Sequence, residues 1–250
     1  MKNGIDEIVN SKDKSFLTEK YLYASDKERL VDLVKGMAEE ALKSITAAVE
    51  SFIEADDAKA ENVIERDDVI DDMEEEIDQE CLYTIAMRQP MREDLRFVYA
   101  VTKIITDLER IGDLSESIAK CSLNLINTEK NKEPFRGEKT ASEEILSMSS
   151  QIEAMFKDLI TAFINEDEKA AHKVMEKCYK FRETGGKAIN NLAVFASGKN
   201  LSETLDIFTN VLWIVRHLDR TGDHIMNIAE RICFIATGVT PESLKKKQIW

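Results

Sequence analysis

Apolar residues recur along this chain at steps of three and four, the spacing that places them on one face of an α-helix. No stretch alternates apolar and polar residues as a half-buried strand does, so the pattern predicts an all-α protein. The clearest series is Phe97, Val101, Ile104, Leu108, Ile111, Ser115 and Ile118. A matching series lies 110 residues further on, at Ile207, Val211, Ile214, Leu218, Thr221, Ile225, Ile228 and Ile232.

Interruptions of this pattern divide the chain into six predicted helices. Pro90 ends the second, because a proline disfavours helix in the residue before it, and Gly238 ends the last. We expect helices over about 27–55, 57–89, 91–128, 142–164, 168–196 and 202–237. Residues 1–26 are predicted to be an irregular N-terminal extension or a short extra helix, residues 129–139 a linker and residues 239–250 a tail.

A short polar string is duplicated within the two matching series. Leu108–Asp113 reads LERIGD and Leu218–Asp223 reads LDRTGD, and each is followed by Ile-Ala at the same distance. An internal repeat of this kind indicates two equivalent halves. The predicted fold is therefore six helices forming two tandem, pseudo-symmetric antiparallel three-helix bundles, one over residues 27–128 and the other over residues 140–238.

The acids of the repeated string lie one helical turn apart. At about 100° per residue, Glu109 and Asp113 are turned away from Leu108 and the core stripe, and Asp219 and Asp223 repeat that offset. Each string also holds a glycine, which costs a helix about 1 kcal/mol relative to alanine. We attribute both glycines to the close approach of another helix.

The second predicted helix carries a run of acids that could join the first pair. Asp67, Asp71 and Glu75 form a stripe beside its core line. If this helix packs against the third, its stripe meets Glu109 and Asp113. Converging carboxylates repel each other unless cations lie between them, and oxygen ligands suit Mg, Mn, Ca or carboxylate-bound iron. The alternative is a solvated acidic face.

Charge and composition restrict the function. The formal charge of −14 argues against binding to duplex nucleic acid. Neither an apolar run of about 20 residues nor a signal peptide is present, so we expect a cytoplasmic protein. The spacing of the four cysteines predicts reduced and mostly buried thiols. The basic run 245–247 is interpreted as a solvated tail.

Three strings of the sequence resemble the PhoU family, the phosphate-uptake regulators of bacteria and archaea. Residues 88–96 read RQPMREDLR, residues 103–113 end in DLERIGD, and residues 219–230 read DRTGDHIMNIAE. The resemblance covers about residues 27–238 and its motifs are specific in combination. It implies two three-helix bundles whose acidic motifs hold metal clusters of iron or zinc. Carried over by motif, the metal ligands are Glu109, Asp113, Asp219 and Asp223, with Asp67, Asp71 and Glu75 as additions.

The resemblance also implies a role and partners. Proteins of this family connect the ATPase subunit of an ABC-type phosphate transporter to a membrane sensor histidine kinase, and they repress the phosphate-starvation response when phosphate is plentiful. This chain is then expected to associate peripherally with membrane complexes. Formation of a homodimer is left as an alternative.

The second half departs from the family pattern. The helix that should match Asp67–Glu75 reads CYKFRETGG over residues 178–186, so most of its acids are missing and Arg182 would repel a cation. His217 and His224 flank the second motif and offer nitrogen ligands, with a plain surface role as the alternative. A metal cluster is therefore better supported at the first motif than at the second.

Two other functions compete with the regulator. A carboxylate-bridged metalloenzyme in a helical bundle would use paired Glu-x-x-His motifs, and no histidine of this chain follows an acid at that spacing. Nucleophile-elbow and nucleotide-binding strings are absent as well, so no enzyme is predicted. Residues 15–30 resemble the segment that enters the PhoU-like domain of sodium-phosphate cotransporters, which makes a soluble regulatory domain the other alternative.

Overall fold

The computed structural model describes residues 3–129, 139–197 and 201–240, and these residues are almost entirely helical. Side chains are described for residues 23–127, 142–192, 194 and 205–240. The predicted linker and tail lie largely outside this range. The helices are α1 (Asn3–Glu54), α2 (Asp57–Glu65), α3 (Asp67–Arg88), α4 (Glu93–Glu129), α5 (Lys139–Ile164), α6 (Glu168–Ser197) and α7 (Leu201–Thr237).

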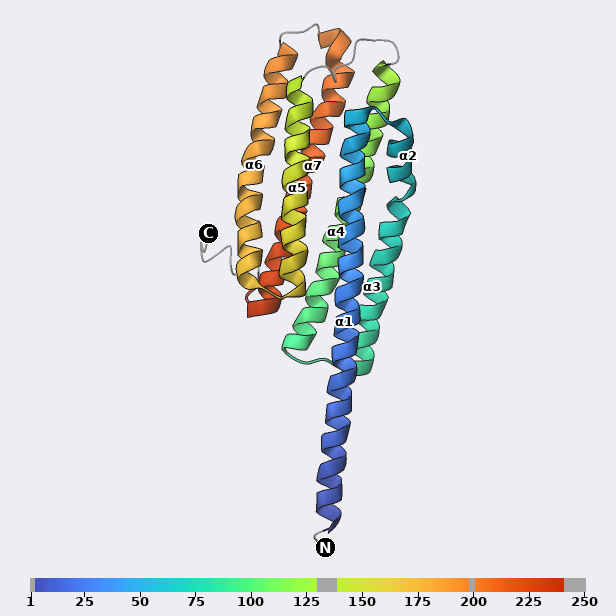
Figure 1. Cartoon of the computed structure of the whole chain (residues 1–250), viewed down its shortest axis with the longest axis vertical. Coiled ribbons are helices and arrows are strands. Elements are labelled where there is room, and N and C mark those ends of the chain that lie inside the picture. The colour runs from blue at the N-terminus through green and yellow to red at the C-terminus, as the bar shows by residue number, and fades with distance from the viewer. Residues whose placement is uncertain (1–2, 130–138, 198–200, 241–250) are drawn as a thin grey trace.

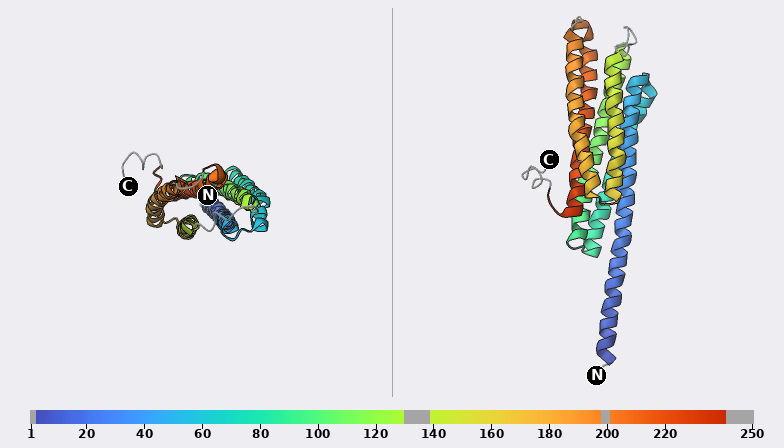
Figure 2. Two further views of the ribbon diagram at one scale, coloured as in Figure 1. Left: turned by 90° about the horizontal axis from the view of Figure 1, so that it is seen from above. Right: turned by 60° about the vertical axis from the view of Figure 1, so that its left-hand side comes forward.

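The helices form two bundles that lie side by side (Figure 1). The first contains α1, α2, α3 and α4, and the second contains α5, α6 and α7. Seen end-on, the helices form a curved row in the order α6, α7, α4 and the α2–α3 pair (Figure 2). Helices α5 and α1 pack against one side of this row. The last helix of each half, α4 in the first and α7 in the second, packs against the other in the middle of the row. The predicted pair of three-helix bundles is confirmed.

The predicted core stripes are buried. Every position of the two series, from Phe97 to Ile118 and from Ile207 to Ile232, is at most 4% exposed. Burial of this kind, repeated over the amphipathic helices, is the main stabilising contribution to a bundle. Three of the four cysteines are buried, Cys121 is half-buried, and all four are free thiols, as predicted.

Two helices depart from the predicted boundaries. The second predicted helix is interrupted at Arg66, where φ is −93° and ψ is 0°, and this separates α2 from α3. Its counterpart α6 runs on without a break through Gly185 and Gly186. Helix α1 begins at Asn3, so residues 3–26 continue it, and its N-terminal part projects beyond the other helices (Figure 1).

The turns use left-handed backbone where the sequence predicts helix ends. Gln89 follows α3 with a φ of 48° and Arg92 precedes α4 with a φ of 54°. Gly238 follows α7 with a φ of 74° and donates its N–H to the Phe234 carbonyl, as expected of a glycine that ends a helix. In the part of the chain that the structure describes, no helix is both long and apolar enough to cross a membrane.

Candidate metal centre and its second copy

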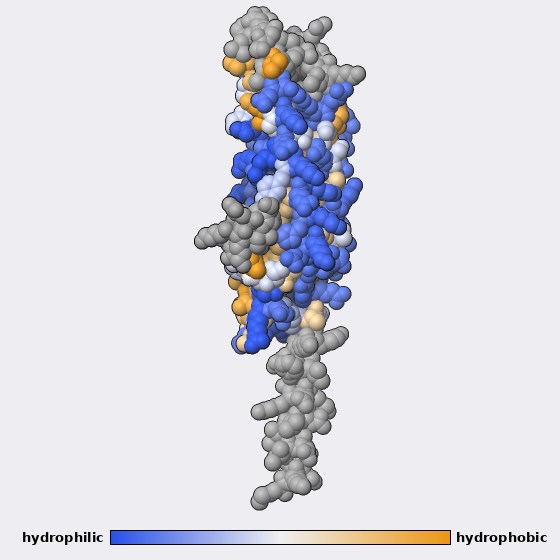
Figure 3. All heavy atoms as spheres, turned by 90° about the vertical axis from the view of Figure 1, so that its left-hand side faces the viewer, coloured by the Kyte–Doolittle hydropathy of each residue, from blue (hydrophilic) through white to orange (hydrophobic). Residues whose placement is uncertain are grey.

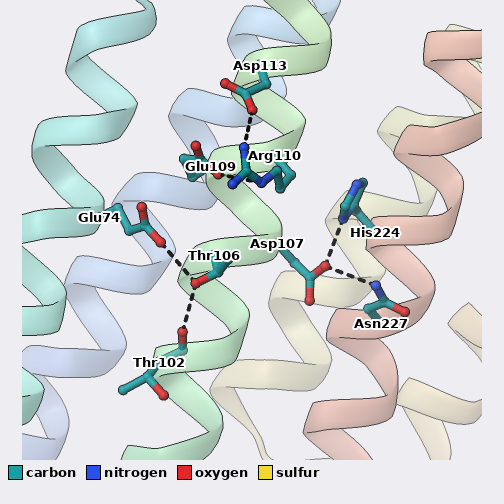
Figure 4. Close-up of polar contacts among 9 residues, drawn as sticks. All are labelled: Glu74, Thr102, Thr106, Asp107, Glu109, Arg110, Asp113, His224 and Asn227. Atoms are coloured by element: carbon teal, nitrogen blue, oxygen red, sulfur yellow. Dashed lines mark hydrogen bonds and ion pairs between the residues drawn. The ribbon is translucent and has the colours of Figure 1, made fainter.

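The first acidic motif lies on α4 in the groove beside α3. Arg110 holds both acids of the motif: its Nη1 donates to Asp113 Oδ2 at 2.7 Å, and its Nε lies 3.3 Å from Glu109 Oε2 (Figure 4). The Glu109 side chain is only 14% exposed, so it is more buried than a side chain on an open outer face would be. The acids were therefore correctly predicted to point away from the core, but one of them is enclosed by the neighbouring helix.

Helix α3 supplies further carboxylates to this groove. Asp67 and Asp71 interact electrostatically with Asp113 across the groove. Glu74 accepts a hydrogen bond from the Thr106 hydroxyl at 3.0 Å (Figure 4). We refer below to the acidic cluster as Asp67, Asp71, Glu74, Glu109, Asp113 and Glu116, whose charges act on one another.

Glu75 does not face α4, although the predicted stripe places it beside Glu109 and Asp113. Its carboxylate accepts a hydrogen bond from Gln79 one turn further along α3, on the exposed side of that helix. Glu74 faces α4 in its place. A side chain one position along a helix is rotated by about 100°, and the stripe could have been drawn through Asp67, Asp71 and Glu74 at steps of four and three.

The electrostatic environment raises the pKa of three carboxyl groups in the cluster. Burial, followed by repulsion from Asp113, raises the pKa of Glu109 to about 7, and Glu74 and Asp71 add to the repulsion while Arg110 opposes it. Burial and then Glu116 raise the pKa of Asp67 to about 6. The pKa of Asp71 is raised for the same kinds of reason. These three carboxyl groups therefore bind a proton, or another cation, more readily in the folded protein than isolated carboxyl groups do.

Gly112 allows the two helices to approach. A β-carbon at this position would lie 3.0 Å from Ile70 Cδ1 and 3.3 Å from Asp67 Oδ1. Ile70 is buried on the core line of α3, and its side chain would have to shift by a few tenths of an ångström to admit a β-carbon. The glycine in the motif thus has the packing role predicted for it, and this contact brings the acids of α3 alongside those of α4.

The donor set of the acidic cluster fits a cation. Glu109 Oε2 is buried and has no hydrogen-bond partner, because Arg110 approaches it outside hydrogen-bond geometry. A buried carboxylate oxygen left in this way is costly unless a cation satisfies it. Among the side chains that the structure describes, however, no three His, Cys, Asp or Glu residues are already arranged as a metal site. An ion would have to draw the carboxylates together and displace Arg110.

The second motif has different neighbours. Arg182 of α6 pairs with Asp223 at 2.5 Å, at the place where α3 carries an acid in the first copy. Asp219 fills the space left by Gly185, where a β-carbon would lie 2.8 Å from its Oδ1. Burial, followed by repulsion from Asp223, raises the pKa of Asp219, and Arg216 and then Arg182 oppose that rise. Here the neighbouring helix contributes an arginine where it contributes acids at the first motif, so these residues fit a metal ion less well than the first set does.

The two histidines near the second motif have other contacts. His224 Nδ1 lies 2.8 Å from Asp107 Oδ1 on α4, and Asn227 donates to the same oxygen at 3.0 Å (Figure 4). This network links the two halves of the molecule. His217 stacks on Trp213, and its Nδ1 is buried without a hydrogen-bond partner. The structure brings neither histidine to Asp219 or Asp223.

Asp107 is a polar residue that sequence reasoning missed. It stands just before the first motif, and nothing in its local pattern distinguishes it from a solvated acid. The antiparallel register of α4 and α7, in which Asp107 meets Asn227 and Asn124 meets Asn210, brings it to His224. The same register places His217 opposite Ser117, so the symmetry-related network is not formed.

Comparison with known proteins gives a consistent family. The profile of the PhoU domain matches residues 34–122 and 145–232, one match in each half. A "Phosphate-specific transport system accessory protein PhoU homolog" of Clostridium acetobutylicum is 31% identical over 87% of this chain and 95% of its own length. A PhoU homolog 1 with the same description, from Methanothermobacter thermautotrophicus, is 30% identical over 90% of this chain and 100% of its own length.

Solved structures agree with the sequence matches. The crystal structure of PhoU from Pseudomonas aeruginosa superposes with a TM-score of 0.73 at 29% identity, covering 89% of this chain and 99% of that one. The crystal structure of the phosphate transport system regulatory protein PhoU from Streptococcus pneumoniae gives a TM-score of 0.77 at 25% identity, covering 86% and 97% of the two chains.

Proposed function

The chain belongs to the PhoU family, and from that premise we propose that it is a regulatory accessory protein of a phosphate-specific transport system. The observation that carries this proposal is the extent of the match. Both halves of the chain match the family, and relatives described as phosphate-specific transport accessory proteins align over 95% or more of their own length. The similarity therefore includes both bundles and the crossing between them.

We further propose that the protein acts as an adaptor between the ATPase subunit of the transporter and a sensor histidine kinase, and represses the phosphate-starvation response. The arrangement of the helices in two similar but unequal halves supports this role, because it offers two distinct surfaces on one molecule (Figure 1).

A cation at the acidic cluster is the second part of the proposal. Glu109 and Asp113 of α4, with Asp67, Asp71 and Glu74 of α3, would hold it, and iron or zinc are the metals that the family suggests. A bound cation supplies positive charge that neutralises these carboxylates and ties α3 to α4. The unpartnered Glu109 oxygen and the raised pKa of Glu109 and Asp67 support this assignment. Asp219 and Asp223 are left out of it, since Arg182 pairs with Asp223.

Deleting the gene tests the regulatory function. We expect phosphate-starvation genes to be expressed in phosphate-rich medium, or phosphate uptake to change, and complementation with the wild-type gene to reverse this. Unchanged expression and unchanged uptake in the deletion strain would show that the proposed function is wrong.

Metal analysis of protein purified without chelator tests the cation separately. The variant Glu109→Gln/Asp113→Asn should lose bound iron or zinc, while the matched variant Asp219→Asn/Asp223→Asn should keep it. Equal metal content in both variants would contradict the assignment to the first copy and leave the regulatory proposal standing.

A further inference from the structure

The arginine of the first motif lies on the acids that would hold a cation. Arg110 Nη1 donates to Asp113 Oδ2 at 2.7 Å, and its Nε lies 3.3 Å from Glu109 Oε2 (Figure 4). The Arg110 side chain is 54% exposed, so packing does not fix it in this position. A metal ion bound by Glu109 and Asp113 would take the place of the guanidinium, so Arg110 competes with the ion for the same oxygens.

Arg110 has a second acidic neighbour on its own helix. Asp107 precedes it by three residues and Asp113 follows it by three, and side chains three residues apart on a helix are neighbours. The arginine therefore lies between two acids, and a change of its rotamer is enough to exchange one for the other. His224 and Asn227 both contact Asp107 at Oδ1, at 2.8 Å and 3.0 Å, so Oδ2 can accept a further donor (Figure 4).

The second copy shows the alternative position of the motif arginine. There, Asp223 has another cationic partner, because Arg182 of α6 lies 2.5 Å from it. Arg220, the arginine of the second motif, makes no ion pair within the described residues. Burial, followed by the charge of Arg220, lowers the pKa of His217, the residue in the place of Asp107. When another cation holds the acid three residues ahead, the motif arginine thus acts on the residue three behind.

Electrostatic attraction, and not packing, decides which cation holds the acid. The side of the molecule that carries α6 is largely hydrophilic (Figure 3), and the side chains of Arg182 and Asp223 are 58% and 52% exposed. In the first copy, an exposed ion pair such as that of Arg110 with Asp113 changes a binding constant by less than about tenfold. A multiply charged ion held by several carboxylates can therefore displace Arg110.

We propose that Arg110 is a switch between Asp113 and Asp107. With a cation on the acidic cluster, Arg110 leaves Asp113 and pairs with Asp107, the residue through which α4 contacts His224 and Asn227 of the other half. Occupancy of the cluster is thereby coupled to the contact between α4 and α7. This inference rests on the cation in the proposed function, and it adds a route by which that cation alters the second half of the molecule.

Zinc titration of the full-length protein by calorimetry, after removal of metal with a chelator, tests the switch. Binding that is lost in Glu109→Gln/Asp113→Asn is assigned to the cluster. Arg110→Gln removes the competitor and should bind zinc there at least about threefold more tightly than the wild type. Asp107→Asn should bind it about two- to threefold more weakly, because the released arginine loses its second partner.

The combination of the two substitutions is the decisive measurement. In the Arg110→Gln background, Asp107→Asn should have no further effect on zinc affinity, because no arginine remains to be released. Equal effects of Asp107→Asn in the two backgrounds would overturn the inference, and so would zinc affinity that Arg110→Gln leaves unchanged.

Lys120→Gln controls for the loss of charge alone. Lys120 pairs with Glu116 of the acidic cluster at 2.5 Å, so this variant also removes one positive charge beside the carboxylates. It should tighten zinc binding and leave the effect of Asp107→Asn as it is in the wild type. If Lys120→Gln abolishes that effect as Arg110→Gln does, general electrostatics accounts for it and the switch is wrong.

The imidazole signals in a nuclear magnetic resonance spectrum provide a second readout. The chain has three histidines, and the variant His224→Gln identifies the signal of His224. Zinc should shift this signal in the wild type and leave it unchanged in Arg110→Gln. Equal shifts in both proteins, or no shift in the wild type while zinc binds at the cluster, would contradict the switch and leave the cation site standing. Absence of zinc binding at the cluster in both proteins would show that the proposed cation, and the switch with it, is wrong.

Discussion

The two copies of the acid-Arg-x-Gly-Asp string have nearly the same sequence and opposite surroundings. In the first copy, the neighbouring helix brings acids toward Glu109 and Asp113, and burial with repulsion raises the pKa of Glu109 to about 7. In the second, the neighbouring helix brings Arg182 to Asp223 and a glycine to Asp219. The carboxylates are alike, and the helix packed against them decides what they can bind.

The difference extends to the crossing of α4 and α7. Asp107 binds His224 and Asn227 of the other half, whereas the residue that occupies its place in the second copy is His217, with an unpartnered nitrogen. The two halves thus share one scaffold, and different residues at the neighbouring positions give them different polar contacts. The following predictions test this contrast, from the largest expected effect to the smallest.

Arg182→Asp should give the second copy an acidic neighbour like that of the first. The variant removes the cation that neutralises Asp223 and adds a carboxylate beside it. We expect metal analysis to show additional bound cation relative to the wild type. Lys187→Asp, an exposed charge reversal on the same helix, is the control and should show no gain. No gain in either variant would mean that the neighbouring charge does not decide cation binding.

Alanine at the two motif glycines should affect stability unequally. At Gly222 a β-carbon would lie 2.5 Å from the buried ring of Phe181, whereas at Gly112 the nearest atom is the terminal methyl of Ile70 at 3.0 Å. We expect Gly222→Ala to lower the free energy of unfolding by about 1–3 kcal/mol through overpacking. At Gly112 the clash is offset by the gain in helix propensity, about 1 kcal/mol, so the change should be near zero. Urea denaturation measures both, and equal losses would contradict the comparison.

The polar contacts where α4 crosses α7 should contribute to stability at Asp107 and not at His217. Asp107→Ala removes the acceptor of Asn227 and the partner of His224, and we expect it to cost about 1–2 kcal/mol of stability. His217→Phe keeps the stacking on Trp213 and removes a nitrogen that has no partner, so it should be neutral or stabilising by less than about 1 kcal/mol. Thermal unfolding of the two variants at one pH provides the measurement. A large loss for His217→Phe would show that this nitrogen has a partner in solution.

The acidic cluster should make stability depend on pH. Because the pKa of Glu109 rises from its usual 4.5 to about 7 on folding, its carboxyl group is protonated in both states below pH 4.5 and has no effect there. Stability is lost as the pH rises from 4.5 through 7, because in this range the unfolded chain has released the Glu109 proton while the folded protein still retains it. Glu109→Gln should therefore be more stable than the wild type at pH 8, by less than about 1 kcal/mol, and equal to it at pH 4.5.

Melting curves recorded with chelator present measure this effect without bound metal. Asp219→Asn should change stability in the same direction, since the pKa of Asp219 is also raised, but by less, because Arg216 and Arg182 both oppose the rise. A variant of Glu109 that lost stability at pH 8 would show that its carboxylate is stabilised in the folded protein.

The amino-acid sequence alone determined most of the fold. The stripes from Phe97 to Ile118 and from Ile207 to Ile232 follow from helical periodicity, which is a local property of the chain, and all of them are buried. Pro90 and Gly238 fixed helix ends for equally local reasons, and the duplicated string revealed the two halves. The continuation of α1 through residues 3–26 was missed because amphipathic patterning reports burial against a core, and this part of the helix projects beyond the bundle (Figure 1).

Only the tertiary structure decided which polar side chains meet. The choice between Glu74 and Glu75 depends on the rotation of α3 against α4, and one residue corresponds to about 100° of that rotation. The pairing of Asp107 with His224 depends on the register of two helices from different halves, more than a hundred residues apart. Periodicity states which face of a helix is apolar, but the packing of buried side chains sets the rotation and register, and these determine the contacts at its polar edges.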